Sequence, residues 1–335
     1  MNIAIIRLSA LGDIIQSSIV LQFIKKYYPN SNIDWFIDDS FEDLLKDHLY
    51  IDRLYSLPLK KKKIIKTLKI LLNARKNNYD LIIDLQGLIK SAIVARILSK
   101  NTYGFDKNSL KENLASYFYK YKISIDYNEN IIIRNIKLLN FALKLDIKKN
   151  EIINKKPCFI VDEKIKYNIL NKITLADKNI LIHMGSSMEN KNYPKEKLIS
   201  LCKMILANYS KTHIFLVWGN DKEKNKANII LDNLKNNRVF ISPKINIKEL
   251  IALTYLSDLV IGNDSGPTHL AFAINKPSIT IFGATPSYRN AFDTNINKTI
   301  DSGKYISDCK HIDKNDFCIK NIDEMQIFNL IKGLL

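Results

Sequence analysis

Short apolar runs alternate with stretches of helical periodicity along most of the chain. Continuous apolar runs at Asn2–Leu8, Ile33–Ile37 and Asp80–Asp84 are typical of strands that are buried on both faces of a parallel sheet. Between the first two runs, Ile14–Tyr28 has the spacing of an amphipathic helix that ends near Pro29. This alternation predicts βαβ units and a doubly wound parallel sheet.

The same rhythm returns in the second half of the chain. The strands predicted there are Asn179–His183, His213–Trp218, Leu259–Gly262 and Ser278–Phe282. The helices predicted between and after them are Lys195–Asn208, Asp221–Leu234, Asn246–Leu256 and Pro267–Ile274. Two blocks of this kind predict an α/β protein with two Rossmann-like domains facing a cleft.

The segment between the two blocks differs in character. Residues 107–146 look helical, with aromatic side chains interleaved among lysines, whereas residues 148–157 are polar and predict a linker. We therefore expect one domain over residues 1–150 and another over residues 158–320. The last apolar stretch, residues 321–335, is expected to form a closing C-terminal helix.

The charge of the chain bears on its partners rather than on its fold. The 335 residues include 51 Lys and Arg against 34 Asp and Glu, for a formal net charge of +17, with an unbroken run at Lys60–Lys63. Such an excess favours nucleic acid, anionic lipid or phosphorylated sugars as partners. A lysine-rich proteome would also explain the total charge, but it explains the clustered run less well.

The cysteines and the N-terminal residues indicate the cellular compartment in which the protein is expected. The cysteines form no Cys-x-x-Cys pair, so zinc at Cys309, His311 and Cys318 is not favoured, and reduced structural cysteines are expected. The first apolar run lacks a basic leader and a cleavage site, and no stretch reaches the roughly 18 apolar residues of a spanning helix. We expect a cytoplasmic protein whose membrane contact is peripheral.

The sharpest motif is Asn263–His269, with the sequence NDSGPTH, between an apolar strand and a predicted helix. Gly266 lets backbone N–H groups approach an anion such as a diphosphate. Asp264 is placed to accept hydrogen bonds from sugar hydroxyls, and His269 lies within the first helical turn. A capped helix start would explain Asp264 or Ser265 alone, but it does not require so many polar residues in one turn.

Three further motifs follow predicted strands, which is where doubly wound sheets bind their ligands. Ser9–Asp13 presents a carboxylate that suits a general base or, more simply, a helix cap. His183–Ser187 with Lys191 suits the binding of a leaving diphosphate, although a Gly/Ser loop with a solvated lysine is the simpler alternative. Trp218–Glu223 ends in a carboxylate that suits ribose hydroxyls or the first turn of a helix.

In this order and spacing, the motifs resemble those of the bacterial lipopolysaccharide heptosyltransferases. The resemblance covers nearly the whole chain and looks strongest for the members that add the first heptose to the Kdo of Kdo-lipid A. It is carried by SALGDIIQS at residues 9–17, YDLIIDLQGLIKSA at 79–92, LASYFY at 114–119, the WG turn with its glutamate at 218–223, and NDSGPTHLAFAINKPSITIFGAT at 263–285.

The resemblance implies a GT-B fold, ADP-heptose as donor, inversion at the anomeric carbon and no cofactor. In it, Asp13 matches the proposed catalytic base, and Lys191 matches a lysine near the donor phosphates. Ser186 and Ser187 match a pair of threonines in the phosphate loop. The other donor-site positions that it implies are Glu223 at the ribose, Ile245 at the adenine, and Asp264, Ser265, Gly266 and His269 at the heptose and diphosphate.

The acceptor side departs from the family. A basic cluster that is often arginine is here Lys60, Lys61, Lys62 and Lys63, and an arginine of the middle segment appears as Lys111. Lysine lacks the bidentate fork of arginine, so the acceptor's phosphates or carboxylates are expected to be held differently. The implied partners are ADP-heptose and Kdo-lipid A, met by a monomer on the cytoplasmic face of the inner membrane.

Three alternatives remain open. A heptosyltransferase that acts on the first heptose uses the same donor, and only the lysine run favours the more acidic Kdo acceptor. A basic nucleic-acid-binding protein would fit the net charge, but no nucleic-acid module is recognisable. A GT-B-shaped epimerase of nucleotide sugars would need further acid–base carboxylates and no lipid acceptor. No Asp-x-Asp sequence occurs, so a divalent metal held by that motif is not indicated.

Overall fold

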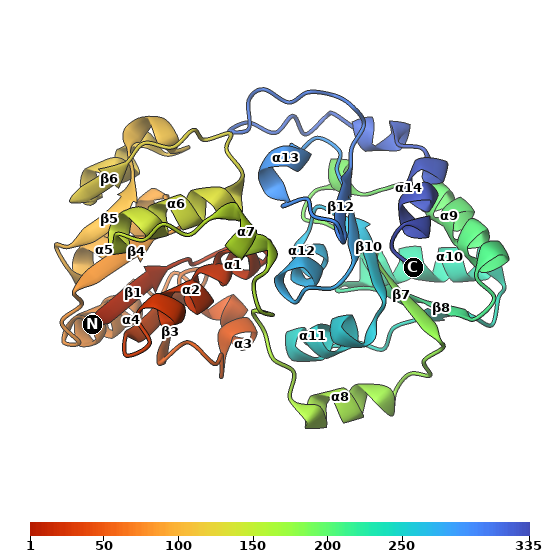
Figure 1. Cartoon of the computed structure of the whole chain (residues 1–335), viewed down its shortest axis with the longest axis horizontal. Helices are drawn as coiled ribbons and strands as arrows, with labels where there is room; N and C mark the ends of the chain where they lie inside the picture. Colours follow the sequence, from red (N-terminus) through yellow and green to blue (C-terminus); the bar gives the residue numbers. More distant parts are fainter. The chain divides into compact units, whose positions relative to one another are not determined.

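A computed structural model describes all residues from Met1 to Leu335. The chain forms two compact units, Met1–Ile160 and Val161–Leu335, which can be followed by colour in Figure 1. Each unit is built on one six-stranded sheet. None of the helices combines the length and apolar character needed to span a bilayer.

The first unit has a wholly parallel sheet with the strand order β3-β2-β1-β4-β5-β6. The chain adds strands on one side of β1 and then on the other, so the carboxyl ends of β1 and β4 flank a topological switch point. The strands are β1 (Asn2–Ile6), β2 (Asn32–Asp38), β3 (Arg53–Leu57), β4 (Leu81–Asp84), β5 (Thr102–Phe105) and β6 (Tyr121–Ile123).

Helices cover both faces of this sheet. Its α-helices are α1 (Leu11–Ser17), α2 (Ile19–Tyr27), α3 (Glu42–Leu45), α4 (Ile64–Arg75), α5 (Ile89–Leu98), α6 (Ile131–Leu143) and α7 (Lys149–Ile153). One core cluster joins Ala4 and Ile6 of β1 to buried residues of α4 and α5. Because side chains alternate along a strand, Ile3 and Ile5, which are fully buried, face the opposite side.

The second unit repeats the arrangement. Its parallel strands, read from β9, have the order β9-β8-β7-β10-β11-β12, which is the pattern of the first sheet. The strands are β7 (Lys178–His183), β8 (Thr212–Val217), β9 (Val239–Ile241), β10 (Leu259–Asn263), β11 (Ser278–Ile281) and β12 (Asn297–Ile300). The α-helices are α8 (Glu163–Leu170), α9 (Lys195–Asn208), α10 (Asp221–Leu234), α11 (Ile247–Leu256), α12 (Gly266–Ala273), α13 (Ser287–Asn290) and α14 (Glu324–Lys332).

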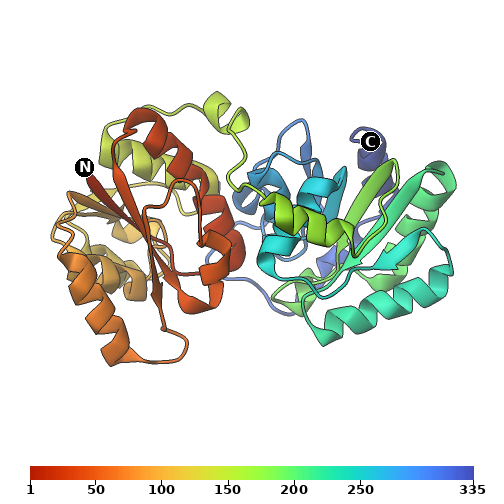
Figure 2. The ribbon, with the colours of Figure 1, turned by 90° about the horizontal axis from the view of Figure 1, so that it is seen from below.

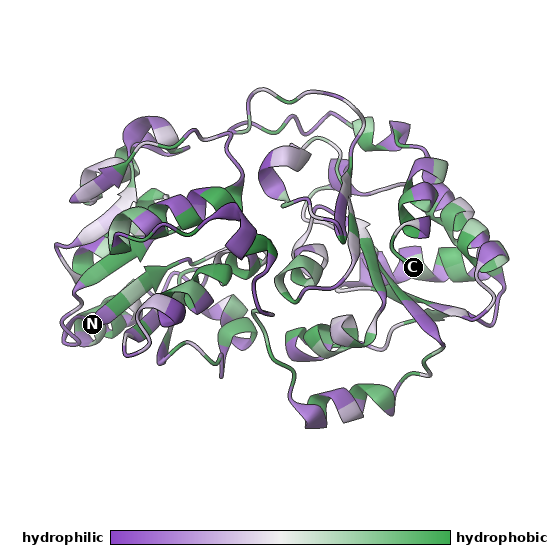
Figure 3. Cartoon of the chain, in the orientation of Figure 1, coloured by the Kyte–Doolittle hydropathy of each residue, from purple (hydrophilic) through white to green (hydrophobic).

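The cores consist mainly of isoleucine and leucine from the strands, which are largely green in Figure 3. Strands buried on both faces need apolar residues at nearly every position, as the continuous apolar runs indicated. The C-terminal helix α14 adds Ile327, Phe328 and Ile331 to the core of the second unit. The predicted α/β class with two Rossmann-like sheets is therefore confirmed.

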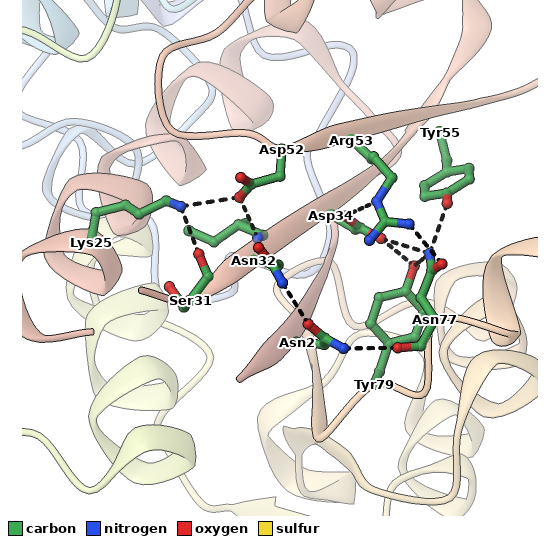
Figure 4. Close-up of polar contacts among 11 residues, drawn as sticks. Asn2, Lys25, Ser31, Asn32, Asp34, Asp52, Arg53, Tyr55, Asn77 and Tyr79 are labelled. Atoms are coloured by element: carbon green, nitrogen blue, oxygen red, sulfur yellow. Dashed lines mark hydrogen bonds and ion pairs between the residues drawn. The ribbon is translucent and has the colours of Figure 1, made fainter. Parts of the chain in front are cut away.

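A buried polar network stands towards the amino ends of β2 and β3, away from the carboxyl edge of the sheet (Figure 4). Asp34 Oδ2 accepts hydrogen bonds from Tyr79 Oη at 2.6 Å and Asn77 Nδ2 at 3.0 Å, and Asp34 Oδ1 lies 3.3 Å from Arg53 Nε. Asn77 Nδ2 also reaches Tyr55 Oη at 2.8 Å. Burial raises the pKa of Asp34, although Tyr79 and Arg53 counteract it.

Three local predictions were wrong. The helix expected from Ile14 begins at Leu11 and is interrupted at Ser18, whose hydroxyl donates to the carbonyl of Ile15 at 2.7 Å. Residues 107–146 are only partly helical, because β6 pairs with β5 and Tyr103 stacks on Tyr121. Residues 148–157 contain α7, which is held to α2 by a 2.5 Å ion pair between Lys26 and Glu151.

Candidate functional site

The motifs that follow β7, β8, β9 and β10 all stand at one edge of the second sheet. Since every strand is parallel, their carboxyl ends meet at that edge, beside the switch point between β7 and β10. The predicted donor-binding residues of these loops are Ser186, Ser187, Lys191, Glu223, Ile245, Asp264, Ser265, Gly266 and His269. A phosphate- and sugar-binding surface is compatible with this edge.

Asp264, the first residue after β10, is the centre of a buried polar cluster. Its Oδ2 atom lies 2.6 Å from Lys191 Nζ and accepts a 2.8 Å hydrogen bond from Thr285 Oγ1. Its Oδ1 atom lies 2.9 Å from His269 Nε2, and Asn290 Nδ2 donates to Oδ2 at 3.3 Å. Four segments of the unit therefore converge on one carboxylate.

The charge on Asp264 is stabilised inside the unit. Burial by itself would raise the pKa of this carboxyl, but the hydrogen bond from His269 and the Lys191 ammonium outweigh burial. The net pKa of Asp264 lies well below the usual range for aspartate. Both oxygens are already engaged within the chain, so Asp264 positions Lys191 and His269 as well as being a candidate for sugar hydroxyls.

Glu223 holds the loop after β8 by hydrogen bonds and lies against the loop after β7. Its Oε2 atom accepts from the Gly219 N–H at 2.7 Å, and its Oε1 atom accepts from Asn220 Nδ2 at 2.7 Å. A Cβ atom on Gly185 would come within 2.0 Å of Glu223 Oε1. Only glycine at position 185 therefore allows the carboxylate to lie against this loop.

The remaining donor-side residues line the same edge with fewer contacts. Ser186 Oγ donates to the Met188 carbonyl at 2.8 Å, and Ser187 is exposed. Gly266 is the first residue of α12, and no side chain caps that helix, so its first N–H groups are not used by a cap. Ile245 follows β9 and is half-buried.

In the first unit, Asp13 lies in the first turn of α1, after the carboxyl end of β1. Its Oδ2 atom forms a 2.9 Å ion pair with the buried Arg7 and accepts from the Ala10 N–H at 3.2 Å. Its Oδ1 atom makes no hydrogen bond within the chain, and the side chain is 42% exposed. One oxygen is thus fixed and the other is accessible, which is what a general base requires.

Further polar groups surround this turn at the end of β4. Gln86 Oε1 accepts from the Leu8 N–H at 2.8 Å, and Lys90 Nζ donates to Ser9 Oγ at 3.3 Å. Asp84 is fully buried and accepts from Tyr119 Oη at 2.7 Å. Burial raises the pKa of Asp84 despite this hydrogen bond.

The predicted acceptor lysines are exposed, but they are not alike. Lys60 Nζ donates to Ser40 Oγ at 2.8 Å, and Lys61 Nζ lies 2.7 Å from Asp39 Oδ2. The ammonium groups of Lys62, Lys63 and Lys111 form no ion pair with the chain. The backbone of Lys60 donates to Asp38 at the end of β2, so the run lies at the carboxyl edge of the first sheet.

Sequence reasoning missed several side chains of these clusters. Arg7 interrupts the apolar run Asn2–Leu8, and this single cation was the available signal for a partner of Asp13. Thr285 stands within the quoted GAT stretch, but nothing local indicated that it contacts Asp264. Lys226 donates to the Tyr193 carbonyl at 2.7 Å, and burial lowers its pKa to about 8.

The structure thus brings Lys191, Asp264 and His269 into one cluster, whereas Glu223 makes its contacts separately. Asp13 and the lysine run belong to the first unit and the donor residues to the second. The roles assigned to all these residues stay predictions. No group of three or more His, Cys, Asp and Glu side chains is arranged to hold a metal ion.

Comparison with known proteins agrees with this reading of the fold. The structure is similar to that of the E. coli heptosyltransferase WaaC with ADP, with a TM-score of 0.80, 21% identity and coverage of 100% of both chains. It is also similar to E. coli ADP-heptose lps heptosyltransferase II, with a TM-score of 0.76, 18% identity and coverage of 100% of this chain and 98% of that one. At such identities the likeness establishes the fold.

The sequence comparisons establish the family. Residues 67–314 match glycosyltransferase family 9 (heptosyltransferase). The chain is 57% identical over 338 aligned positions to lipopolysaccharide heptosyltransferase 1 of Campylobacter coli, which covers 100% of this chain and 99% of that protein. On the family match and on an identity that extends over the whole length, the chain belongs to glycosyltransferase family 9, the heptosyltransferases.

Proposed function

We propose that the protein transfers L-glycero-D-manno-heptose from ADP-heptose to the Kdo of Kdo-lipid A, in the synthesis of the lipopolysaccharide inner core. The observation that carries this proposal is the 57% identity, over the whole chain, to a protein named lipopolysaccharide heptosyltransferase 1. The fold alone does not choose the acceptor, since a heptosyltransferase II structure matches with a similar TM-score of 0.76. The sequence identity and the lysine run favour Kdo over a heptose acceptor.

The donor is proposed to bind to the second unit, within residues 158–320. Lys191 and the first N–H groups of α12 suit the diphosphate, because a buried cation and a helix N-terminus both stabilise anions. Ser186 and Ser187 would complete the phosphate loop. The further proposed contacts are Glu223 to the ribose, Ile245 to the adenine, and Asp264, Ser265 and His269 to the heptose.

The acceptor is proposed to bind to the first unit, within residues 1–150, near Lys60–Lys63 and Lys111. Asp13 takes the proton from the acceptor hydroxyl as the oxygen attacks the anomeric carbon opposite the diphosphate. The new C–O bond forms as the bond to ADP breaks, and ADP leaves with the electron pair. Arg7 holds Asp13 Oδ2, so the free Oδ1 atom is the one that accepts the proton.

Charge on the departing ADP is proposed to be balanced by Lys191 and by backbone N–H groups, without a metal or another cofactor. We also propose that the enzyme works as a monomer, peripherally on the cytoplasmic face of the inner membrane. Its acceptor is a lipid, whereas its donor is water-soluble. The proposed location follows from that pair of substrates, whereas the monomeric state stays a separate prediction.

The decisive experiment offers ADP-heptose with either of two acceptors, Kdo-lipid A and its singly heptosylated product, and follows ADP release. The proposal predicts rapid release with Kdo-lipid A and slow release with the heptosylated product. The opposite preference would make the protein a heptosyltransferase of the second type. A lack of transfer to both acceptors would refute the proposed function.

A further inference from the structure

Helix α4 exposes an unusual amount of apolar surface. Ile64 is 76% exposed, Ile65 is 74% exposed, Leu68 is 44% exposed and Leu72 is 47% exposed. At 3.6 residues per turn these four side chains fall within an arc of about 100°. They form one continuous stripe, which we name the α4 face.

The stripe is not explained by packing within the first unit. The helix is anchored by a neighbouring arc of its surface, where Thr67, Leu71 and Ala74 are buried against the core shared with α5. A surface helix normally keeps its apolar residues on that anchoring side and presents polar ones to water. Figure 2 shows α4, in orange, on the outside of its unit.

The segment that forms α4 and the loop before it carries only positive charge. Between Pro58 and Lys76 the chain has no acidic residue, and its cations are Lys60, Lys61, Lys62, Lys63, Lys66, Lys69, Arg75 and Lys76. Lys66 and Lys69 are exposed and form no ion pair within the chain. At 3.6 residues per turn Lys69 lies beside the apolar stripe, whereas Lys66 lies about 100° from Ile65, the nearest member of the stripe. The helix therefore combines exposed isoleucine and leucine with unpaired lysine.

We propose that the α4 face is a membrane-docking surface, in which Ile64, Ile65, Leu68 and Leu72 insert among the acyl chains of an anionic bilayer. An amphipathic helix of this kind lies in the plane of the interface, with its apolar stripe buried and its lysines at the level of the phosphates. The loop before α4 carries the lysine run and lies at the carboxyl edge of the sheet, as Asp13 does. Docking by α4 therefore places that edge at the membrane surface.

Charge complementarity favours a bilayer over a second copy of the chain. A symmetric dimer through the α4 face would bring two sets of unpaired cations together, which is destabilising unless an anion separates them. A bilayer supplies both the apolar phase for the stripe and the phosphates for the lysines. The α8 region provides a useful contrast, since Ile160 and Tyr167 are 70% and 65% exposed there. Asp162 and Glu163 accompany the lysines of that region, so its charge is mixed.

The test measures co-sedimentation with vesicles of phosphatidylglycerol and phosphatidylcholine, and with vesicles of phosphatidylcholine alone. We compare wild type with the triple variant Ile64→Ser, Ile65→Ser, Leu68→Ser and with the matched control Ile160→Ser, Tyr167→Ser. Wild type and control should bind the anionic vesicles, and the triple variant should bind about tenfold more weakly or worse, because three inserted side chains are lost. Circular dichroism and thermal unfolding verify that each variant folds.

A second measurement separates docking from catalysis. The inference rests on the proposed function for its lipid-borne acceptor, so turnover is also measured with a water-soluble, deacylated acceptor. The triple variant should keep that turnover within about twofold, since serine at these positions removes only apolar surface. If wild type transfers heptose neither to the lipid-borne acceptor nor to the deacylated one, the proposed function is refuted. Binding to vesicles would still show whether the α4 face docks on a membrane.

Two results would overturn the docking proposal. One is equal binding of wild type and the triple variant to anionic vesicles, or an equal loss in the control. The other is a wild-type dimer in sedimentation equilibrium that the triple variant abolishes, which would assign the α4 face to a second copy. As an independent readout, Ile65→Trp should shift its fluorescence to the blue on anionic vesicles, and an unchanged spectrum would contradict insertion.

Discussion

Arg7 and Asp13 form an ion pair in which only one carboxylate oxygen is used. Arg7 is itself fixed, because it donates to the Leu85 carbonyl at 2.6 Å. Asp13 also supports the start of α1 through the Ala10 N–H. A helix-capping role and a proton-accepting role are therefore compatible in one side chain, since they fall on different oxygens.

Replacing Asp13 by Asn should separate these two roles. The amide keeps an oxygen for Ala10 but cannot accept a proton, so turnover should fall by roughly a hundredfold or more. Donor affinity should not change, because Asp13 belongs to the first unit. Steady-state rates and calorimetry with ADP-heptose measure the two quantities. Near-normal turnover would exclude Asp13 as the base.

Glu223 offers the cleanest test of the donor site. Glu223→Ala removes a proposed acceptor for ribose hydroxyls and should weaken ADP-heptose binding by about 1–3 kcal/mol. Glu223→Gln is the matched control, since it retains one oxygen and the shape that lies against Gly185. Equal donor affinity in wild type and Glu223→Ala, measured by calorimetry, would remove Glu223 from the site. Asp264 is less suitable, because its carboxylate also holds Lys191.

His183, the last residue of β7, should make stability depend on pH. Burial lowers its pKa to about 4 from 6.5, so the unfolded chain binds the proton more tightly than the folded one. The free energy of unfolding is therefore at its full value above about pH 6.5, where His183 is neutral in both states. It falls as the pH drops towards 4, because the unfolded chain takes up the proton first. Between pH 7.5 and 4.5 the loss should be about 2–3 kcal/mol.

Urea unfolding of wild type and His183→Leu at both pH values measures this contribution. The pKa of His48 is also lowered to about 4, but it affects both proteins equally. The difference between the two proteins should therefore shrink or reverse in favour of the variant at low pH. Parallel stability curves would show that His183 binds its proton equally in both states.

At the scale of elements, the lysine run is a loop whose residues are unequally free. Lys60 donates a hydrogen bond to Ser40, and Lys61 forms an ion pair with Asp39. The ammonium groups of Lys62 and Lys63 form no ion pair within the chain. The run connects β3 to α4 at the carboxyl edge of the sheet. Acceptor phosphates or carboxylates would therefore meet Lys62 and Lys63 first.

Replacing Lys60–Lys63 with Gln should raise the apparent dissociation constant of the acceptor and leave that of the donor unchanged. Each lysine near an anionic surface contributes on the order of 1 kcal/mol, and screening acts over about 8 Å at physiological salt. Acceptor affinity of wild type should fall with added salt, and that of the variant should fall less. Identical salt curves would leave the run without a part in acceptor binding.

The length of an element decides how well the sequence predicts it. The bounds of α9 and α10 are as predicted, because both helices repeat an amphipathic pattern over several turns. The short strands β6 and β9 went unpredicted, because three residues carry no periodic signal. At the candidate site, the motifs that follow strands could be found from local sequence, because the apolar strands before them could be recognised. Contacts such as Thr285 to Asp264 join distant segments and have no local signature.

The whole molecule applies one strand order twice. Each sheet has its switch point between the first and fourth strands of its unit, and the proposed ligand-binding residues lie in segments that follow the carboxyl ends of strands. The repetition explains why the motifs of both halves occupy equivalent places in the chain. The proposed proton acceptor, Asp13, belongs to one unit, and Lys191, the cation proposed to bind the donor phosphates, belongs to the other.

Activity of the intact enzyme should survive chelation. The charge of the departing diphosphate has candidate partners in Lys191 and in the first turn of α12, which supply what a divalent metal supplies elsewhere. Turnover in excess EDTA should equal turnover with added magnesium. A chelated enzyme that is inactive until magnesium is restored would reveal a metal requirement in catalysis.

If the donor diphosphate binds at Lys191, as proposed, the Lys191–Asp264 contact makes donor binding an exchange of one anionic partner of the lysine for another. A phosphate that attracts the Lys191 ammonium competes with a carboxylate 2.6 Å away, so it gains less than it would from a lysine with no partner. Asp264 remains compensated by His269 and Thr285 when the lysine moves. Because the lysine already has an internal counter-ion, few solvent ions are released on binding. The affinity for ADP-heptose should then respond only weakly to ionic strength, in a chain whose net charge of +17 suggests the opposite.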